Sequence, residues 1–342
     1  MRELLTPLLS GSGPFVAFLG LAAVGVLVLL VASRLAHDAD TIAEETKLGG
    51  LWIGSLLLAA ATSLPELLTD INAALLDVPD IGAGDLLGSS MANMAILALT
   101  NLLFLQKRMF AHADNRHALV ALLGIMLISI VGFGIAVRGI PMGPVGFDST
   151  LILGVYVGGM WLLRGIVQMP AAEDWESPKT RHRLWRAYAG FGVATLVLVL
   201  LAPALVVTAE IFAEESGLSN GFVGTLLVGA MTSFPELSAT LMAVRLGSYD
   251  LAVGGILGSN AFNMTYFFVM DLFYTKGPVT NAVSLDHMPT VFFAAIMMAL
   301  GGLAILYRQP ERPGVARVES LLILATYVGG MALLATRQGG TP

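Results

Sequence analysis

The chain has 342 residues, of which 56% are hydrophobic and only 12% are charged. A soluble domain carries roughly 25% charged residues, so this chain has too few of them to cover itself in water. We therefore interpret it as a polytopic membrane protein whose main partner is the lipid bilayer. It contains no Cys, which excludes disulfides, thiolate nucleophiles and Cys-based metal sites. The formal net charge is −6, and its basic residues are dispersed, which argues against nucleic acid as a partner.

Ten segments are long and apolar enough to cross a bilayer, which requires about 20 mostly apolar residues per helix. The first has a polar rather than basic lead-in and is too long for a signal-peptide core, so we interpret it as a retained helix. The sequence predicts an all-α polytopic membrane protein with ten transmembrane helices at 14–35, 48–76, 81–105, 117–138, 149–169, 187–212, 218–246, 250–274, 288–307 and 318–336.

The longest polar connection divides these segments into two sets of five. This predicts a first half at 1–170, a linker at 171–186 and a second half at 187–342. The connections after helices 1, 3, 5, 7 and 9 carry 14 of the 18 Lys and Arg residues, and the other side carries 4. Positive charge accumulates on the cytoplasmic side of membrane proteins. The linker is therefore predicted to be cytoplasmic and both termini to lie outside.

The two halves contain related sequences. Residues 39–94 align with residues 209–264 at a constant offset of 170, with 23 identities in 56 positions and no gap. Because each half has an odd number of predicted helices, the second copy would enter the membrane in the opposite orientation. Inverted repeats of this kind are typical of secondary transporters.

Each repeat centres on Thr-Ser-x-Pro-Glu, at residues 62–66 and 232–236. A Gly-Ser pair follows 22 positions after each Glu, and an Asn follows 27 positions after it. Proline breaks or kinks a helix, and a broken helix is tolerated in a membrane only where it lines protein or a water-filled cavity. We expect breaks in helices 2, 3, 7 and 8, the third and eighth at the Gly-Ser pairs.

These motifs place two carboxylates among hydroxyl, amide and carbonyl oxygens, without nitrogen or sulfur ligands. Hard cations such as Ca²⁺ prefer sites of this kind. An ionised Glu within a membrane needs a partner, and neither motif contains a Lys or Arg. A bound cation or a proton would supply the missing charge. The candidate cation ligands are Glu66, Glu236, Thr62, Thr232, Ser63, Ser233, Ser89, Ser259, Asn93 and Asn263.

The motifs TSLPE…GSSMAN and TSFPE…GSNAFN resemble the alpha-repeats of the sodium/calcium exchanger superfamily of cation/Ca²⁺ antiporters. The resemblance implies exchange of Ca²⁺ for Na⁺ by alternating access in a prokaryotic-type plasma membrane, with no cofactor and no enzymatic activity. It implies that Glu66 and Glu236 coordinate Ca²⁺, while the Thr, Ser and Asn residues complete the flanking Na⁺ sites. It also implies that helices 1 and 6 slide against the other helices. The oligomeric state stays open, and a monomer could be sufficient.

This sequence departs from the family pattern at several positions. Some sodium/calcium exchangers carry Asp at one of the two distal Asn positions, whereas Asn93 and Asn263 are both neutral. Asp70 and Asp85 have no acidic counterpart in the second repeat. Asp70 would either admit cations near the external end or face solvent. The cation/proton branch usually carries Gly-Asn-x-x-Glu, so the Thr-Ser-x-Pro-Glu motif favours Na⁺ over H⁺, and stoichiometry and divalent selectivity stay open.

An intramembrane protease and a passive cation channel are the alternatives to an antiporter. Residues 82–85, 249–250 and 203–205 match the GxGD, YD and PAL signatures of intramembrane aspartyl proteases, but their order along the chain differs from that family's order. A passive cation channel is the stronger rival. Broken helices in an inverted repeat favour alternating access over a permanently open pore.

Overall fold

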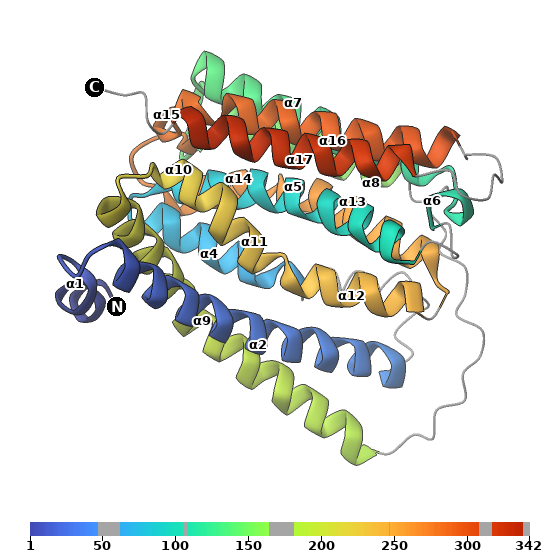
Figure 1. Ribbon diagram of the computed structural model, residues 1–342, viewed down its shortest axis with the longest axis horizontal. Helices are drawn as coiled ribbons and strands as arrows, with labels where there is room; N and C mark the ends of the chain where they lie inside the picture. The colour runs from blue at the N-terminus through green and yellow to red at the C-terminus, as the bar shows by residue number, and fades with distance from the viewer. Residues whose placement is uncertain (47–61, 105–108, 164–180, 246, 308–316, 338–342) are drawn as a thin grey trace.

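The computed structural model describes residues 1–46, 62–104, 109–163, 181–245, 247–307 and 317–337 (Figure 1). Apart from one short antiparallel pair, β1 (Pro141–Met142) with β2 (Val145–Gly146), its regular structure is helical. The helices are α1 (Arg2–Leu9), α2 (Pro14–Thr46), α4 (Leu64–Leu75), α5 (Pro79–Leu103), α6 (Met109–His112), α7 (His117–Val137), α8 (Phe147–Leu163), α9 (Arg181–Ser216), α10 (Asn220–Val223), the π-helix η2 (Gly224–Val228), α11 (Gly229–Thr232), α12 (Phe234–Arg245), α13 (Tyr249–Asn263), α14 (Tyr266–Phe273), α15 (Val279–Ala282), the 3₁₀-helix η3 (Leu285–His287), α16 (Met288–Tyr307) and α17 (Val318–Arg337).

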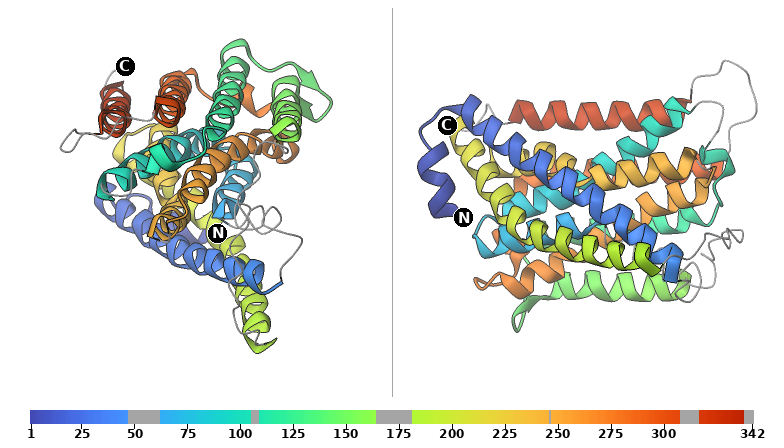
Figure 2. Two further views of the ribbon diagram at one scale, coloured as in Figure 1. Left: turned by 90° about the vertical axis from the view of Figure 1, so that its right-hand side faces the viewer. Right: turned by 90° about the horizontal axis from the view of Figure 1, so that it is seen from below.

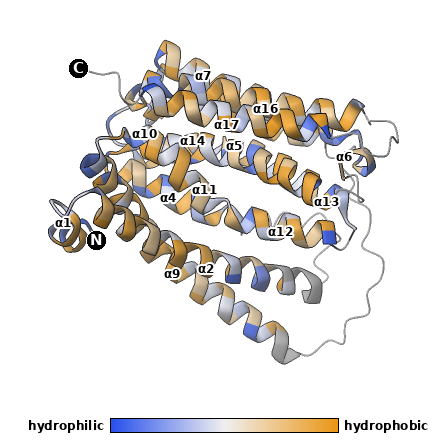
Figure 3. Cartoon of the chain, in the orientation of Figure 1, coloured by the Kyte–Doolittle hydropathy of each residue, from blue (hydrophilic) through white to orange (hydrophobic). Residues whose placement is uncertain are grey.

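The helices form one elongated bundle. In Figure 1, α2 and α9 lie together along one side, α7, α16 and α17 lie along the opposite side, and α5 lies between them. The view along the long axis in Figure 2 gives the same order. Large apolar side chains such as Leu122, Phe133 and Leu303 are exposed on the outside, where Figure 3 shows mostly hydrophobic residues. An apolar outer surface of this extent suits lipid rather than water.

Within the described residues, six helices are long and apolar enough to cross a membrane: α2, α5, α7, α9, α16 and α17. A seventh span results if α10 to α12 are taken as one bent helix. The protein is thus an all-helical membrane protein. The predicted span 48–76 falls partly outside the described residues, and the predicted span 250–274 is divided between α13 and α14. Of the predicted linker 171–186, residues 171–180 lie outside the described residues, and α9 already begins at Arg181.

Two helices are interrupted at the Thr-Ser-x-Pro-Glu motifs, as the prolines predict. Ser63 separates the helical residue Thr62 from α4, and Ser233 separates α11 from α12 at a bend of 42°. Pro65 therefore lies in the first turn of α4, where its missing N–H leaves no intrahelical bond unmade. Pro235 has the same place in α12. The breaks create two new helix starts inside the bundle.

The predicted break in helix 3 is wrong. Helix α5 continues without interruption through Gly88 and Ser89. Gly88 serves close packing instead, because a Cβ atom there would lie 2.3 Å from the backbone oxygen of Thr225 in η2. Helix 8 is interrupted, but at Met264 and Thr265 between α13 and α14 rather than at its Gly-Ser pair.

Candidate cation-binding site

The two motif glutamates lie at the starts of the two half-helices. Glu66 is in the first turn of α4 and Glu236 is in the first turn of α12. From these starts α4 and α12 run to opposite ends of the bundle (Figure 1). Both side chains are enclosed by protein, with residue exposures of 0% for Glu66 and 4% for Glu236. The site is therefore closed to solvent in this conformation.

Glu236 receives hydrogen bonds from both halves of the chain. The Ser63 hydroxyl donates to Glu236 Oε1 over 3.3 Å, and the Ser259 hydroxyl donates to the same oxygen over 3.3 Å. Thr62 also hydrogen-bonds to this carboxylate. The other oxygen, Oε2, has no hydrogen-bond partner among the described residues. Three of the predicted hydroxyl ligands thus hydrogen-bond to the Glu236 carboxylate. Its oxygen Oε2 is available to a cation.

Glu66 has a different environment. Neither of its carboxylate oxygens has a hydrogen-bond partner among the described residues, although both are buried. The charge of Glu236 acts directly on it, as do those of Asp85 and Asp70. A buried carboxylate without partners is costly, at several kcal/mol or more, unless it is neutralised. The arrangement therefore calls for a positive charge at Glu66.

The hydroxyls equivalent to those around Glu236 do not bond to Glu66. Thr232, the counterpart of Thr62, donates to Asp85 Oδ1 over 2.7 Å. Ser89, the counterpart of Ser259, donates to the same oxygen over 3.3 Å. The sequence prediction did not assign Asp85 to the site. Its position four residues before Ser89 was an available signal, because residues i and i+4 share one helix face.

The predicted ligands Asn93, Asn263 and Ser233 make no hydrogen bond to Glu66 or Glu236 among the described residues. Asn93 donates to Asn260 over 2.9 Å and keeps its own Oδ1 without a partner, while the buried Asn263 amide has no hydrogen-bond partner among the described residues. Ser233 bonds back to the Gly229 carbonyl over 2.8 Å. Asn260 itself was not among the predicted ligands.

Two further observations complete the site. The Tyr266 hydroxyl donates to the backbone oxygen of Ser63 over 3.1 Å, a contact that sequence reasoning missed because α14 is distant in the chain. Asp70 is fully buried, so the alternative in which it faces solvent is wrong. Its carboxyl group lies within hydrogen-bond reach of Asp85 and has no other hydrogen-bond partner among the described residues.

The donor set limits the ligands that the site can bind. Among the described residues, no three Asp, Glu or His side chains converge closely enough to hold a metal ion by themselves. A cation must therefore take hydroxyl, amide or carbonyl oxygens in addition to carboxylates. That mixture is the one that Ca²⁺ and other hard cations accept, at about 6–8 oxygens for Ca²⁺.

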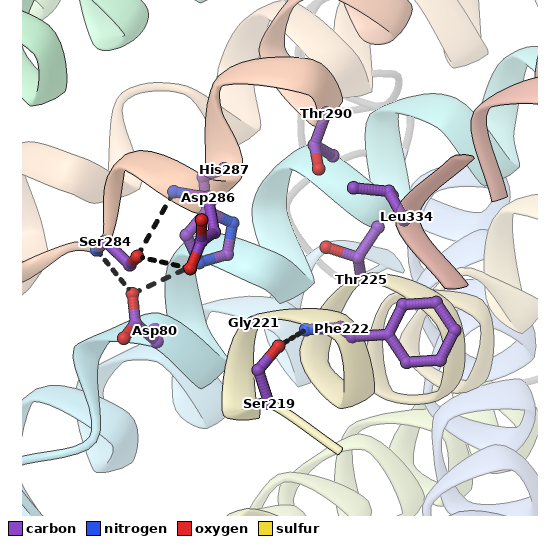
Figure 4. Close-up of a pocket in the computed structure, with 10 residues that line it drawn as sticks. All are labelled: Asp80, Ser219, Gly221, Phe222, Thr225, Ser284, Asp286, His287, Thr290 and Leu334. Carbon is purple, nitrogen blue, oxygen red and sulfur yellow. Dashed lines mark hydrogen bonds and ion pairs between the residues drawn. The ribbon is translucent and has the colours of Figure 1, made fainter. Parts of the chain in front are cut away.

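A pocket of about 90 Å³ lies elsewhere, at the N-terminal ends of α5 and α10 (Figure 4). Asp80, Ser284 and His287 line one side of it, and Thr225 and Leu334 line the other. It contains none of the ten predicted ligands. The pocket is therefore not the candidate cation site.

Nearly the whole chain matches the sequence model of one protein family. The family model described as "Sodium/calcium exchanger protein" matches residues 16–164 and 186–335. The chain belongs to the sodium/calcium exchanger protein family. It is accordingly a membrane transporter for cations and not an enzyme.

Two named proteins align with most of the chain. The inner membrane protein YrbG of Escherichia coli (strain K12) is 26% identical over 324 residues, covering 90% of this chain and 94% of that protein. The sodium/calcium exchanger MaX1 of Methanosarcina acetivorans is 26% identical over 342 residues, covering 90% and 96%.

Solved exchanger structures share the fold. The H⁺/Ca²⁺ exchanger CAX superposes with a TM-score of 0.69 at 12% identity, covering 94% of this chain and 85% of that chain. The sodium-calcium exchanger NCX_Mj, soaked with Na⁺ and Ca²⁺, superposes with a TM-score of 0.58 at 22% identity, covering 92% and 98%.

The positions of the two protease-like aspartates agree with membership of the exchanger family. Asp85 lies on α5 and accepts hydrogen bonds from the hydroxyls of Thr232 and Ser89. Asp250 lies in the first turn of α13, accepts a hydrogen bond from the Asp114 backbone over 2.6 Å and pairs with His117 at 3.1 Å. The two carboxylates thus belong to separate groups of residues rather than forming a dyad.

Proposed function

We propose that this family member is a secondary active antiporter that exchanges Ca²⁺ for Na⁺ by alternating access. The observation that carries the proposal is the pair Glu66 and Glu236. Both are buried at the starts of half-helices, and three of their four carboxylate oxygens have no hydrogen-bond partner among the described residues. A divalent cation between them would balance both charges.

The proposed Ca²⁺ ligands are these two glutamates, with oxygens of Thr62, Ser63 and Ser259 beside Glu236. Thr232, Ser233, Ser89, Asn93 and Asn263 are proposed to complete flanking Na⁺ sites. The hydrogen bonds that Ser63 and Ser259 make to Glu236 support this assignment, because those hydroxyls already lie at the carboxylate. The proposed architecture is ten transmembrane helices in two inverted five-helix halves, 1–170 and 187–342, joined by a cytoplasmic linker at 171–186. The repeats at 39–94 and 209–264 contribute the site.

Helices α2 and α9 are the proposed moving pair. They pack against each other along one side of the bundle (Figures 1 and 2). The hydrophobic cluster that includes Leu21, Leu35 and Leu205 joins them to α4, α10, η2 and the first turn of α5, and it is separate from the larger cluster around α5, α7, α13 and α16. Sliding of this pair would open the buried glutamates first to one side of the membrane and then to the other.

Transport assays test the proposal and its counter-ion. In proteoliposomes, uptake of ⁴⁵Ca²⁺ is expected only when an opposing Na⁺ gradient is present. Equal uptake driven by a proton gradient without Na⁺ would establish Ca²⁺/H⁺ exchange instead. Uptake that follows the Ca²⁺ gradient alone and needs no counter-ion would identify a passive channel. The relative MaX1, named a sodium/calcium exchanger, supports Na⁺. The four buried carboxylates, which have no basic partner among the described residues, would suit protons; they are Glu66, Glu236, Asp70 and Asp85.

The proposed location is a prokaryotic-type plasma membrane with both termini outside. The relative YrbG is named an inner membrane protein. Helix α1 and the C-terminal end of α17 lie at the same end of the bundle (Figure 1). An even number of crossings requires both termini on one side, and the distribution of basic residues favours the outside.

A further inference from the structure

The two repeats differ in one pattern of hydrogen bonds. Glu236, the motif glutamate of the second repeat, accepts hydrogen bonds from Thr62 and Ser259. Their counterparts Thr232 and Ser89 donate to Asp85. Position 85 corresponds to Gly255 in the second repeat, which has no side chain to act in this way. Asp85 therefore adds a carboxylate to one half of the site only.

Asp85 has a second carboxylate beside it. Asp70, one helical turn after Glu66 on α4, is fully buried, and its carboxyl group lies within hydrogen-bond reach of that of Asp85. A Cβ atom on Gly82, one turn before Asp85, would lie 3.4 Å from Asp70 Oδ1. Apart from their contact with each other, both Asp70 oxygens and Asp85 Oδ2 lack hydrogen-bond partners among the described residues. Two carboxyl groups buried side by side must share either a proton or a cation.

We infer that Asp85 and Asp70, with the hydroxyls of Ser89 and Thr232, form a second cation site that takes a monovalent ion of the size and hardness of Na⁺. The inference rests on the proposed Ca²⁺/Na⁺ exchange and names the residues that give one Na⁺ site its charge. Both hydroxyl oxygens lie within hydrogen-bond distance of Asp85 Oδ1 and 3.2 Å from each other, so they are gathered beside the carboxylate where an ion could contact them.

The number of available oxygens distinguishes a monovalent ion from Ca²⁺. Once a cation replaces the proton between Asp70 and Asp85, three carboxylate oxygens and two hydroxyls give five oxygens, whereas Ca²⁺ takes about 6–8. Water has little room to complete a larger shell. Cβ atoms on Gly84 and Gly88 would lie 2.7 Å and 2.3 Å from backbone oxygens of α10 and η2, so the helices already touch on this side. The site also supplies the charge that the two neutral distal asparagines do not.

Equilibrium binding of ⁴⁵Ca²⁺ to the purified full-length protein, displaced by increasing Na⁺ at constant pH and ionic strength, tests the inference. In Asp85→Asn, we expect the Na⁺ concentration for half-displacement to rise about tenfold or more, as for a lost contact to a charged group, with a shallower displacement curve. Affinity for Ca²⁺ without Na⁺ should change less than affinity for Na⁺, because Asp85 acts on Glu66 only through its charge and is not a Ca²⁺ ligand.

Asp70→Asn gives the same test with less risk to folding, because among the described residues the Asp70 carboxyl group contacts Asp85 and accepts no other hydrogen bond. The matched control is Asp77→Asn, which removes an exposed charge two turns further along, at the end of α4. Displacement curves of both site variants that coincide with that of Asp77→Asn would overturn the inference. A loss of Ca²⁺ affinity as large as the loss of Na⁺ affinity would also overturn it, because Asp85 would then belong to the Ca²⁺ site.

A Glu236→Gln variant separates this failure from failure of the proposed function. If Glu236→Gln binds Ca²⁺ as the wild type does, the central site is wrongly assigned, whatever the aspartate variants show. If Glu236→Gln loses Ca²⁺ and the aspartate variants behave like the control, only the second site is refuted.

Discussion

The side-chain hydroxyls of Ser63 and Ser259 lie 3.0 Å apart, although 196 positions separate them in the chain. Ser63 belongs to the break before α4 and Ser259 lies on α13, so the contact joins the two halves of the molecule. Both hydroxyls also reach Glu236 Oε1. A cation that attracts this carboxylate would pull on both halves together, which links occupancy of the site to its closure.

Replacing Glu66 with Gln is expected to abolish Na⁺-driven Ca²⁺ uptake and to raise stability in Ca²⁺-free buffer. The wild-type carboxylate is buried without a hydrogen-bond partner among the described residues, so removing its charge removes a desolvation cost. Adding Ca²⁺ at 100 times its Kd should stabilise the wild type by about 2.7 kcal/mol and leave Glu66→Gln unchanged. Thermal unfolding with and without Ca²⁺ measures both effects. A variant that transports at the wild-type rate would refute the assignment of Glu66.

Replacing Ser63 or Ser259 with Ala is expected to weaken Ca²⁺ binding without abolishing it. Each hydroxyl bonds to the charged Glu236, and such a hydrogen bond contributes about 1.5–3 kcal/mol, so affinity should fall roughly tenfold or more. Ser129→Ala is the control, because Ser129 is exposed and its hydroxyl donates to the backbone oxygen of Ile125, far from the glutamates in the chain. Titration calorimetry with Ca²⁺ gives the affinities. Equal affinities for all three variants would contradict the site.

Replacing Gly88 with Ala tests the close packing of α5 against η2. The new Cβ atom would lie 2.3 Å from Thr225 O, a backbone atom that cannot move aside cheaply. Overpacking of this kind costs about 1–3 kcal/mol. At its repeat counterpart Gly258, an added Cβ atom would have no neighbour within 4 Å among the described residues, so Gly258→Ala should be neutral or slightly stabilising in its helix.

Thermal unfolding and uptake of ⁴⁵Ca²⁺ should therefore separate the two variants: Gly88→Ala impaired in both, Gly258→Ala in neither. Equal behaviour would mean that the repeats pack alike at these glycines, contrary to the structure.

Local chemistry explains which features the sequence could predict. Pro65 and Pro235 lack an N–H, so the breaks next to them follow from covalent structure alone. The apolar segments and the repeated motif likewise predicted a helical membrane protein of the exchanger family, which the fold and the family match confirm. These features depend on residues close together in the chain.

The features that the sequence did not predict depend on packing between distant segments. Gly88 and Ser89 resemble a weak point in a helix, yet α5 stays intact because α10, η2 and α11 pack tightly along it. The hydrogen bond from Thr232 to Asp85 spans 147 positions. Nothing in either local sequence shows that Thr232 faces Asp85 rather than Glu66. That choice follows from the relative placement of α5 and α11.

The orientation in the membrane can be tested directly, because the chain contains no Cys and every introduced thiol is unique. Ser12 and Asn115 are both exposed, the first between α1 and α2 and the second between α6 and α7. These two connections lie at opposite ends of the bundle (Figure 1). With positive charge concentrated on the cytoplasmic side, a membrane-impermeant maleimide should label Ser12→Cys in intact cells and Asn115→Cys only after permeabilisation. The Cys-free parent gives the background, and the reverse pattern would place both termini in the cytoplasm.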